Sequence, residues 1–405
     1  MRGSARRPKP SVRAARPDPV PDFSGLPGLT HVAAAVSGGS DSMALLRLLD
    51  QARRTASLFP KITVLTVDHG LREAAAAEAA KVQGWCAALG LPHQTLRWEG
   101  EKPLAGIQAR ARRARYDLMS AWCRSNDAQA LLTAHTMDDQ AETVLMRLAR
   151  TNSPDSLAGI PARGQWAGLP LLRPLLGMRR AALRRLLQAA GQNWIEDPSN
   201  EDPRYERVRI RRTLAEDEAQ IERLAALAKT SAETVERLDN ACNRWIAIHL
   251  TEDDWGYCHA PRQALEGLPA ALVQRILGRI IRHYGGGTGT PEREELVRLA
   301  QWMGTEGPLR RTLAGAVLGK RRDRFWVARE AARIEADPVL VGRGGQVVWD
   351  HRFVIRAPSG SEVRKVSGVH PAQAEGVPVH ARLSYPEVVV PQGHAQVAFL
   401  RLISS

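Results

Sequence analysis

The sequence has few cysteines and no long apolar run, and each shortage excludes a class of protein. The four cysteines are far apart and form no Cys-x-x-Cys pair: Cys86, Cys123, Cys242 and Cys258. This argues against a structural zinc site, an iron–sulfur cluster or a sulfur relay, and it suits a reducing cytosol. No apolar run approaches the ~20 residues that a membrane span needs. We therefore expect a cytoplasmic protein without a membrane anchor.

Positive charge, in contrast, is abundant. The chain has 57 Lys and Arg against 43 Asp and Glu, a formal net charge of +14. Such a balance favours a polyanionic partner such as nucleic acid, although an Arg-rich proteome produces it as well. Residues 1–27 are rich in arginine and proline and lack the apolar segment of a secretory signal. We predict a basic, disordered tail there.

A chain of 405 residues is too long for one hydrophobic core, so two or three domains are expected. In residues 28–213, apolar runs alternate with helical patterns, which predicts an α/β domain with a doubly wound parallel sheet. The helical, charged pattern of residues 214–335 predicts a separate, mostly helical domain. Residues 336–405, rich in Val, Gly and Pro, predict a small β-rich segment.

The first predicted strand, Val32 to Val36, leads into the turn Ser37-Gly38-Gly39-Ser40-Asp41-Ser42 and then into a helix. Free N–H groups and the helix dipole favour an anion at such a turn, and glycines let the backbone approach a phosphate. Asp41 would hold Mg²⁺ against that phosphate. A serine- and glycine-rich helix cap without a ligand is the alternative.

Other polar residues follow the second and fourth predicted strands, at the same edge of the sheet. Asp68 ends the second strand, and His135 precedes a helix in which Asp139 and Glu142 share a face. Acidic residues in a first helical turn often only complement the dipole. Beside a phosphate loop, they would instead hold Mg²⁺ or the amino groups of a cationic substrate. Arg112, on a basic helix, would face the triphosphate.

These motifs carry a family resemblance. SGGSDS resembles the pyrophosphate-binding loop of the PP-loop ATPases, also called N-type ATP pyrophosphatases, which have an adenine nucleotide alpha hydrolase-like fold. More specific motifs follow in the order found in tRNA(Ile)-lysidine synthetases: VDHGLR (67–72), ARRARY (111–116), AHTMDDQAET (134–143), RPLL (173–176), EDPSN (196–200) and RVRIR (207–211). The match covers residues 30 to 212 well.

The resemblance implies a carbon–nitrogen ligase for tRNA modification. Such an enzyme adenylates the wobble cytidine of a CAU-anticodon isoleucine tRNA with ATP and joins lysine to C2, giving lysidine, AMP and pyrophosphate. ATP and Mg²⁺ are the implied cofactors, and a homodimer is a further expectation. The implied ATP-binding residues are Ser37, Gly38, Gly39, Ser40, Asp41, Ser42 and Asp68, with Asp41 also the metal ligand.

The remaining roles also follow from the resemblance, which implies that the helical domain of residues 214–335 binds tRNA. Arg112 would stabilise the transition state at the α-phosphate. Asp139, Glu142 and Arg209 would bind lysine, Arg207 and Arg211 would contact tRNA, and His135 would accept a proton from the amine. The catalytic set is thus Asp41, Arg112, His135, Asp139 and Glu142.

The chain departs from the family pattern in two places. Thr136 stands where the family usually has a second histidine, and residues 150–160 lack several glycines of a glycine-rich loop, which should stiffen that segment. Two other functions stay open. A PP-loop tRNA thiolase would normally show paired cysteines, and a non-catalytic RNA-binding protein on the same fold would explain the charge.

Overall fold

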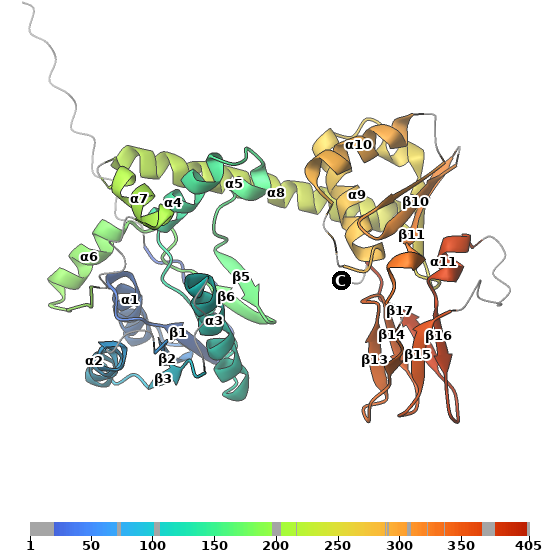
Figure 1. Ribbon diagram of the computed structural model, residues 1–405. Helices are drawn as coiled ribbons and strands as arrows, with labels where there is room; N and C mark the ends of the chain where they lie inside the picture. The colour runs from blue at the N-terminus through green and yellow to red at the C-terminus, as the bar shows by residue number, and fades with distance from the viewer. Residues whose placement is uncertain are drawn as a thin grey trace, which may run out of the picture. The chain divides into compact units, whose positions relative to one another are not determined.

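The computed structural model describes residues 20–70, 74–100, 106–196, 204–215, 217–287, 289, 291–305, 309–321, 323–335, 337–366 and 377–402 (Figure 1). Most of the predicted basic tail lies outside these residues, as do positions 197–200 of the EDPSN motif. The chain divides into two compact units, residues 1–235 and 236–405, which are described separately. The division falls within a long helix, α8 (Glu218–His249), whereas the expected domain boundary at 213–214 precedes that helix.

The first unit is built on a six-stranded sheet in the order β3-β2-β1-β4-β6-β5. All neighbouring pairs are parallel except β5 and β6, so the predicted parallel sheet is confirmed. The strands are β1 (His31–Ala35), β2 (Lys61–Asp68), β3 (His93–Arg97), β4 (Leu131–Leu132), β5 (Arg163–Trp166) and β6 (Leu169–Leu172).

Helices cover both faces of this sheet because β1 is apolar on both sides. Val32 and Ala34 share one core cluster with residues of α1, α2 and α6, whereas Ala33 joins a second with residues of α3. A third cluster joins α4, α5, α7 and the start of α8. The bounds are α1 (Ser40–Thr55), α2 (Ala74–Ala88), α3 (Ile107–Ser125), α4 (Met137–Leu148), α5 (Pro154–Leu157), α6 (Arg180–Ala189) and α7 (Glu206–Leu214).

One expectation within this unit is wrong. Four prolines in residues 151–177 predict a loop, yet these residues contain α5 and the hairpin β5–β6. Pro170 lies in β6, but the two residues that pair with β4 are the next ones, Leu171 and Leu172. A proline just before a paired stretch costs the parallel ladder no hydrogen bond, so the hairpin extends the central sheet.

The second unit contains α9 (Ala270–Tyr284), α10 (Arg293–Gly304) and a five-stranded antiparallel sheet in the order β7-β8-β11-β10-β9. Only a hairpin was expected where β9 to β11 lie, and β7 and β8 were not predicted. Their bounds are β7 (Thr251–Asp253), β8 (Tyr257–Pro261), β9 (Arg310–Leu313), β10 (Ala316–Lys320) and β11 (Arg324–Arg329). Two short 3-10 helices follow β8 and β11: η2 (Arg262–Leu265) and η3 (Ala331–Arg333).

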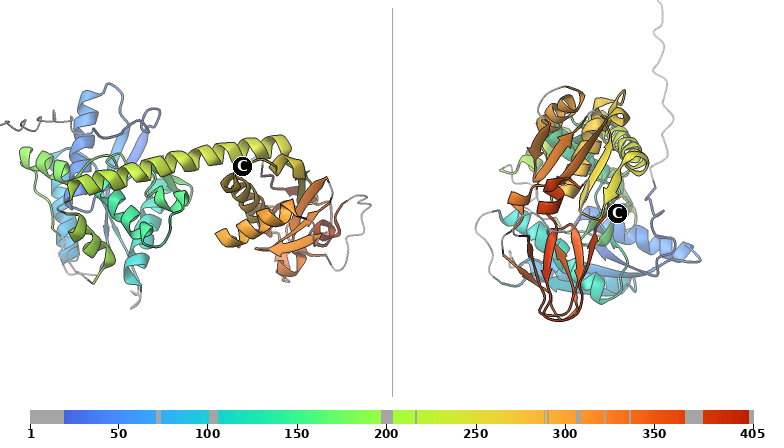
Figure 2. Two further views of the ribbon diagram at one scale, coloured as in Figure 1. Left: turned by 90° about the horizontal axis from the view of Figure 1, so that it is seen from above. Right: turned by 90° about the vertical axis from the view of Figure 1, so that its right-hand side faces the viewer.

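The predicted β-rich carboxyl-terminal segment is confirmed as two three-stranded sheets, β12-β15-β16 and β13-β14-β17. Strands β13 to β17 are labelled in Figure 1, and the sheets are drawn in orange and red in the right-hand view of Figure 2. The elements are β12 (Val339–Leu340), β13 (Gln346–Trp349), β14 (Phe353–Arg356), β15 (Glu362–Lys365), α11 (Val379–Leu383), β16 (Pro386–Val389) and β17 (Gln396–Phe399). In the part of the chain that the structure describes, no helix is long and apolar enough to cross a membrane.

Candidate active site

The turn after β1 requires glycine at its second position. Gly38 has φ of +89°, and a Cβ built there would lie 2.5 Å from Cδ1 of Ile195. The backbone N–H of Ile195 donates to the Gly38 carbonyl oxygen at 2.8 Å. Residues just before the EDPSN motif therefore pack on the turn and fix its shape.

Gly39 is a different case. Its φ of −69° suits any residue, and the nearest atom to a Cβ there would be Ser37 Oγ at 3.8 Å. No side chain caps α1 at this position among the described residues, so the first N–H groups of α1 keep free donor capacity. The Ser42 hydroxyl closes the turn by donating to the Gly39 carbonyl at 2.9 Å. The open space and free donors are what a phosphate needs.

Asp41 lies in the first turn of α1 and faces the start of α6. Nε of Arg180 donates to Oδ2 of Asp41 at 2.9 Å, and Arg184 Nε lies 3.4 Å from Ser40 Oγ. Burial raises the pKa of Asp41, and the Arg180 guanidinium partly offsets this effect. Two arginines of α6 thus stand beside the phosphate loop, which sequence reasoning did not identify.

Thr136 caps the start of α4. The Thr136 hydroxyl oxygen accepts a hydrogen bond from the Asp139 backbone N–H at 3.3 Å. The Thr136 backbone N–H and the Thr136 hydroxyl both donate to Asp139 Oδ2, at 2.8 and 2.9 Å. This capping box satisfies the helix end and fixes the Asp139 carboxylate. The departure from the family pattern therefore preserves the position of a predicted site residue.

Asp139 and Glu142 are both buried, and arginines surround them. Arg207 bridges the two carboxylates at 2.9 and 2.6 Å, and Arg211 contacts Glu142 at 2.8 Å. Arg180 reaches Asp139 at 3.0 Å and Glu142 at 3.4 Å. Burial opposes ionisation of Asp139, but Arg180 and Arg207 outweigh it and lower its pKa. The Asp139 carboxylate therefore stays charged at neutral pH, and both carboxylates are paired with arginines.

Asp138 has a separate task. Its Oδ2 accepts the backbone N–H of Arg180 at 2.7 Å and the Arg179 guanidinium at 3.3 Å. Asp138 thereby fastens the start of α6 to the start of α4. The carboxylate–arginine cluster, as we name it, comprises Asp41, Asp138, Asp139, Glu142, Arg179, Arg180, Arg207 and Arg211.

The three predicted arginines of residues 207–211 do not act together. Because α7 is helical, Arg207 and Arg211 share the face toward Glu142, whereas Arg209 is on another face. Arg209 is exposed and donates to the Arg204 carbonyl oxygen at 3.1 Å. The structure thus brings Arg207 and Arg211, and not Arg209, to the predicted lysine-binding carboxylates.

His135 lies among guanidinium groups on the α3 side of the sheet. Burial, together with the charges of Arg173, Arg112 and Arg115, lowers its pKa to about 3, although Asp139 acts in the opposite direction. Arg112 itself is exposed and lies over the Tyr116 ring, 5.2 Å from its centroid. The imidazole is therefore neutral at pH 7 and stands in a positive field that suits an anion.

Asp68 is buried where β2 ends. Its Oδ1 accepts the Gly70 backbone N–H at 2.8 Å, and Arg97 lies 3.6 Å from its Oδ2. These contacts shape the turn after β2 at the same edge of the sheet as the loop after β1. Leu71 and Arg72 of the VDHGLR motif lie outside the described residues.

The segment that lacks family glycines is held by side chains of α4. Arg147 donates to the carbonyl oxygens of Ser156 and Gly159 at 2.8 and 3.0 Å, and Gln140 makes two hydrogen bonds with the Ile160 backbone. A glycine is kept at 159, where φ is +68° and a Cβ would clash with Gln140. The turn is therefore built without the missing glycines.

The residues at the loop fit Mg²⁺ in one respect. In the described residues no group of three or more His, Cys, Asp or Glu could hold a metal ion by itself. Mg²⁺ commonly takes one or two carboxylates and completes its shell with phosphate oxygens and water. Asp41, beside a phosphate loop, is such a carboxylate.

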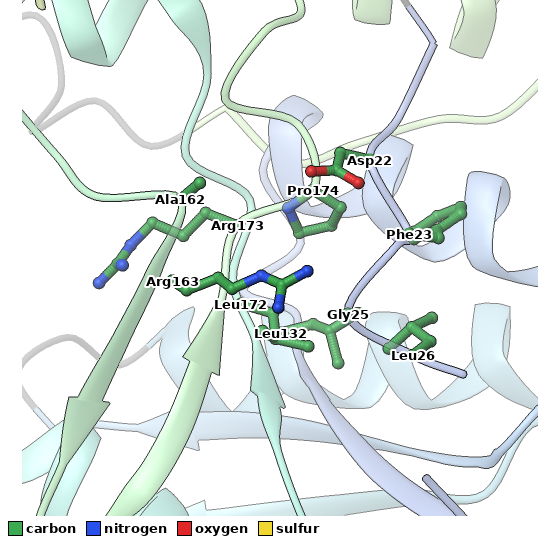
Figure 3. A pocket seen from close by; sticks show the side chains of 10 residues that line it. All are labelled: Asp22, Phe23, Gly25, Leu26, Leu132, Ala162, Arg163, Leu172, Arg173 and Pro174. Atoms are coloured by element: carbon green, nitrogen blue, oxygen red, sulfur yellow. The ribbon is translucent and has the colours of Figure 1, made fainter. Parts of the chain in front are cut away.

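A small pocket lies at the ends of β4 and β6, as Figure 3 shows. Its lining includes Asp22, Arg163 and Arg173, and none of the predicted site residues. The four cysteines are all buried, and burial raises the pKa of the Cys86 and Cys123 thiols to about 11. They are therefore poor nucleophiles, which weighs against sulfur transfer.

Comparison with known proteins agrees with this geometry. Residues 22–218 match the PP-loop domain family, whose members use ATP. A tRNA(Ile)-lysidine synthase from Ruegeria pomeroyi is 41% identical over 80% of this chain and 76% of its own length. One from Rhizobium meliloti is 36% identical over 81% of this chain and 73% of its own.

A remote likeness also exists to a solved structure, the U34-tRNA thiolase NcsA from Methanococcus maripaludis. The identity is 14% and the TM-score 0.43, over 50% of this chain and 72% of that one. At this level the likeness carries no conclusion about activity. The phosphate loop, the paired carboxylates and the extended similarity to curated relatives lead to one assignment: this chain belongs to the tRNA(Ile)-lysidine synthase family.

Proposed function

We propose that this chain uses ATP to activate the wobble cytidine of an isoleucine tRNA with a CAU anticodon and then joins free lysine to C2 of that base. The products are lysidine, AMP and pyrophosphate. The reaction takes place in the cytoplasm, with Mg²⁺ as the metal and, we expect, in a homodimer.

One observation carries the proposal. The Arg180 side chain contacts Asp41 in the phosphate loop and both Asp139 and Glu142 on α4. A single guanidinium is only a few ångströms wide, so the phosphate loop and the buried carboxylates lie side by side. An enzyme that adenylates a base and then attacks it with an amine needs such adjoining sites.

In the first step, the cytidine O2 attacks the α-phosphate and pyrophosphate leaves. The loop of residues 37–42 supplies backbone N–H groups and hydroxyls to the phosphates. Mg²⁺, held by Asp41, would neutralise charge on the phosphates. Arg112, on α3, would stabilise the negative charge that develops on the transferred phosphoryl group.

In the second step, the lysine amine forms a bond to C2, and the C2–O bond breaks with AMP as leaving group. Asp139 and Glu142 bind the cationic substrate, and Arg207 and Arg211 hold these carboxylates in place between turnovers. Because Arg209 is on a different face of α7, we assign it to tRNA phosphate rather than to lysine.

His135 is the candidate base, and its surroundings suggest when it acts. With a pKa of about 3 the imidazole is a weak proton acceptor. Phosphate bound near Arg112 offsets the positive field and raises that pKa. The base is thereby strengthened only when the nucleotide is in place.

The test is to incubate the protein with the CAU-anticodon isoleucine tRNA, Mg²⁺-ATP and radiolabelled lysine, and to score label in tRNA together with AMP and pyrophosphate. We expect label in the tRNA, its loss in Asp41→Asn, and its retention in Asp117→Asn, which removes an exposed carboxylate on α3. ATP cleavage without lysine transfer would overturn the lysine assignment. No ATP cleavage at all would overturn the enzymatic function.

A further inference from the structure

Arg180 contacts carboxylates that belong to two different sites. Its Nε donates to Asp41 at 2.9 Å, and its two terminal nitrogens reach Asp139 at 3.0 Å and Glu142 at 3.4 Å. Its side chain is only 17% exposed, and these carboxylates raise its pKa despite its burial. The guanidinium is therefore permanently charged and fills the space between the phosphate loop and α4.

This arrangement has a consequence for substrates that are cations. Mg²⁺ needs an oxygen of Asp41, and an ammonium group needs oxygens of Asp139 or Glu142. A cation bound to either set of carboxylates lies against the buried Arg180 guanidinium, and the repulsion between like charges favours its replacement of Arg180 there. Since both replacements release the same side chain, the first one lowers the cost of the second.

We propose that Arg180 is a positioning residue that makes binding of Mg²⁺-ATP and binding of lysine mutually dependent. This inference rests on the proposed function. In the free protein Arg180 compensates the charge of both sites. When Mg²⁺-ATP takes Asp41, Arg180 moves from the carboxylates to the bound phosphates, and Asp139 and Glu142 each lose one arginine partner, whose place the amine can take.

The surrounding contacts permit such a movement of the side chain alone. The Arg180 backbone N–H stays bound to Asp138 at 2.7 Å, and Asp138 is also held by Arg179 at 3.3 Å. The start of α6 thus remains anchored while the guanidinium turns. Arg184, one turn later, lies 3.4 Å from Ser40 Oγ, so the α6 face with its positive charges is already at the loop.

Arg207 and Arg211 make the release of Arg180 tolerable. A buried carboxylate that loses its only partner is strongly destabilising. Glu142 keeps its bonds to Arg207 at 2.6 Å and to Arg211 at 2.8 Å after Arg180 departs. The arginines of α7 are therefore the standing partners of Glu142, and Arg180 is the exchangeable one.

The experiment measures lysine binding by calorimetry, in the absence of tRNA, with and without Mg²⁺ and α,β-methylene-ATP, which is not cleaved between its α- and β-phosphates. For the unmodified protein we expect the nucleotide to lower the lysine Kd at least about fivefold, the lower end of ordinary coupling. Lysine must lower the Kd of the nucleotide by the same factor, since coupling is reciprocal.

In Arg180→Ala, lysine should bind equally well with and without nucleotide. Arg180→Lys keeps the charge but cannot span three carboxylates, so it should retain only part of the coupling and serves if the alanine variant does not fold. Arg185→Ala, an exposed arginine of the same helix, should behave like the unmodified protein.

Undiminished coupling in Arg180→Ala and Arg180→Lys, with lysine still bound, would overturn the inference and leave the proposed function standing. Equal lysine affinity with and without nucleotide in the unmodified protein would overturn it as well. Absence of any lysine binding by the unmodified protein would contradict the proposed function itself, and the inference with it.

Discussion

The two units of this chain each contain buried arginines paired with aspartate, and the pairs are built differently. In the second unit Asp350 is held by Arg329 at 3.0 Å and Arg352 at 2.7 Å, a group that we name the Asp350 cluster. Further donors of both arginines bind backbone carbonyl oxygens, among them those of Gly315 and Ser384. Arg329 and Arg352 side chains are 2% and 0% exposed.

The carboxylate–arginine cluster of the first unit lacks this enclosure. The side chains of Arg180, Arg207 and Arg211 donate to carboxylates of the cluster, and Arg179 also reaches Glu218. The Arg207 and Arg211 side chains are 40% and 34% exposed. A guanidinium bound to several main-chain carbonyls joins segments permanently. One bound to carboxylates beside a phosphate loop can be exchanged for a substrate cation. The same residue types thus serve stability in one unit and binding in the other.

The largest expected effect concerns the Asp350 cluster and its contribution to stability. Asp350→Asn leaves two buried arginines without their counter-ion and should lower the free energy of unfolding by about 3 to 5 kcal/mol. Urea denaturation followed by circular dichroism measures it. A loss below about 1 kcal/mol would show that the backbone carbonyls alone suffice.

The matched change in the first unit is Glu142→Gln. It should reduce lysine transfer to tRNA about 100- to 1000-fold, the usual cost of removing an oriented charged group from an active site. The free energy of unfolding should change by no more than about 1 kcal/mol, because the partly exposed arginines regain water. Activity and urea denaturation are measured on the same preparation. Unaltered lysine transfer would remove Glu142 from the binding site.

A smaller effect is expected when the pH is lowered, because the two units contain groups whose pKa values differ. The folded pKa of His135 is about 3, below its ordinary value of 6.5, so only the unfolded chain gains this proton between pH 7 and 5. Stability should therefore fall by about 1 to 2 kcal/mol over that range through this residue. The Arg352 pKa is lowered by burial to about 10, so Arg352 in the Asp350 cluster remains charged throughout.

Urea denaturation of the unmodified protein and of His135→Asn at both pH values isolates this contribution. The difference between the two proteins should shrink as the pH falls, because the asparagine variant has no imidazole to protonate. A difference that is independent of pH would mean that His135 titrates normally in the folded protein.

The smallest expected effect comes from replacing one arginine of each cluster by lysine. Arg211→Lys, at a partly exposed pair, should change the free energy of unfolding by less than about 1 kcal/mol. Arg329→Lys should lower the free energy of unfolding by more than this, since lysine cannot reproduce the several directed hydrogen bonds of that guanidinium. Thermal or urea denaturation ranks the two variants. Equal costs would argue that the two clusters are structurally equivalent.

Much of the fold was readable because its signals are local. The strand, glycine turn and helix at residues 31–55 follow from an apolar run, a turn motif and leucines on one helical face. The hairpin of β5 and β6 was missed because prolines suggested a loop, and short strands depend on their neighbours for pairing. Strands β7 and β8 were missed because they are also short and depend on neighbouring strands for pairing.

Part of the candidate site was readable as well. The spacing of Asp139 and Glu142 indicates one helical face, and the four-residue spacing of Arg207 and Arg211 would have separated them from Arg209 had that segment been recognised as helical. Arg180 gave no such signal. Its partner Asp41 is 139 residues away, and its motif is an ordinary pair of arginines before an apolar helix.

The sequence by itself determined the alternation of strands and helices, the phosphate loop and the residue types near it, because propensity, periodicity and turn chemistry act over a few residues. Tertiary structure alone decided which charges meet. Whether an arginine faces water, a backbone carbonyl or a buried carboxylate depends on packing between distant segments, and Coulomb energy depends on that distance and on burial. The role of Arg180 between two sites is therefore a property of the folded chain.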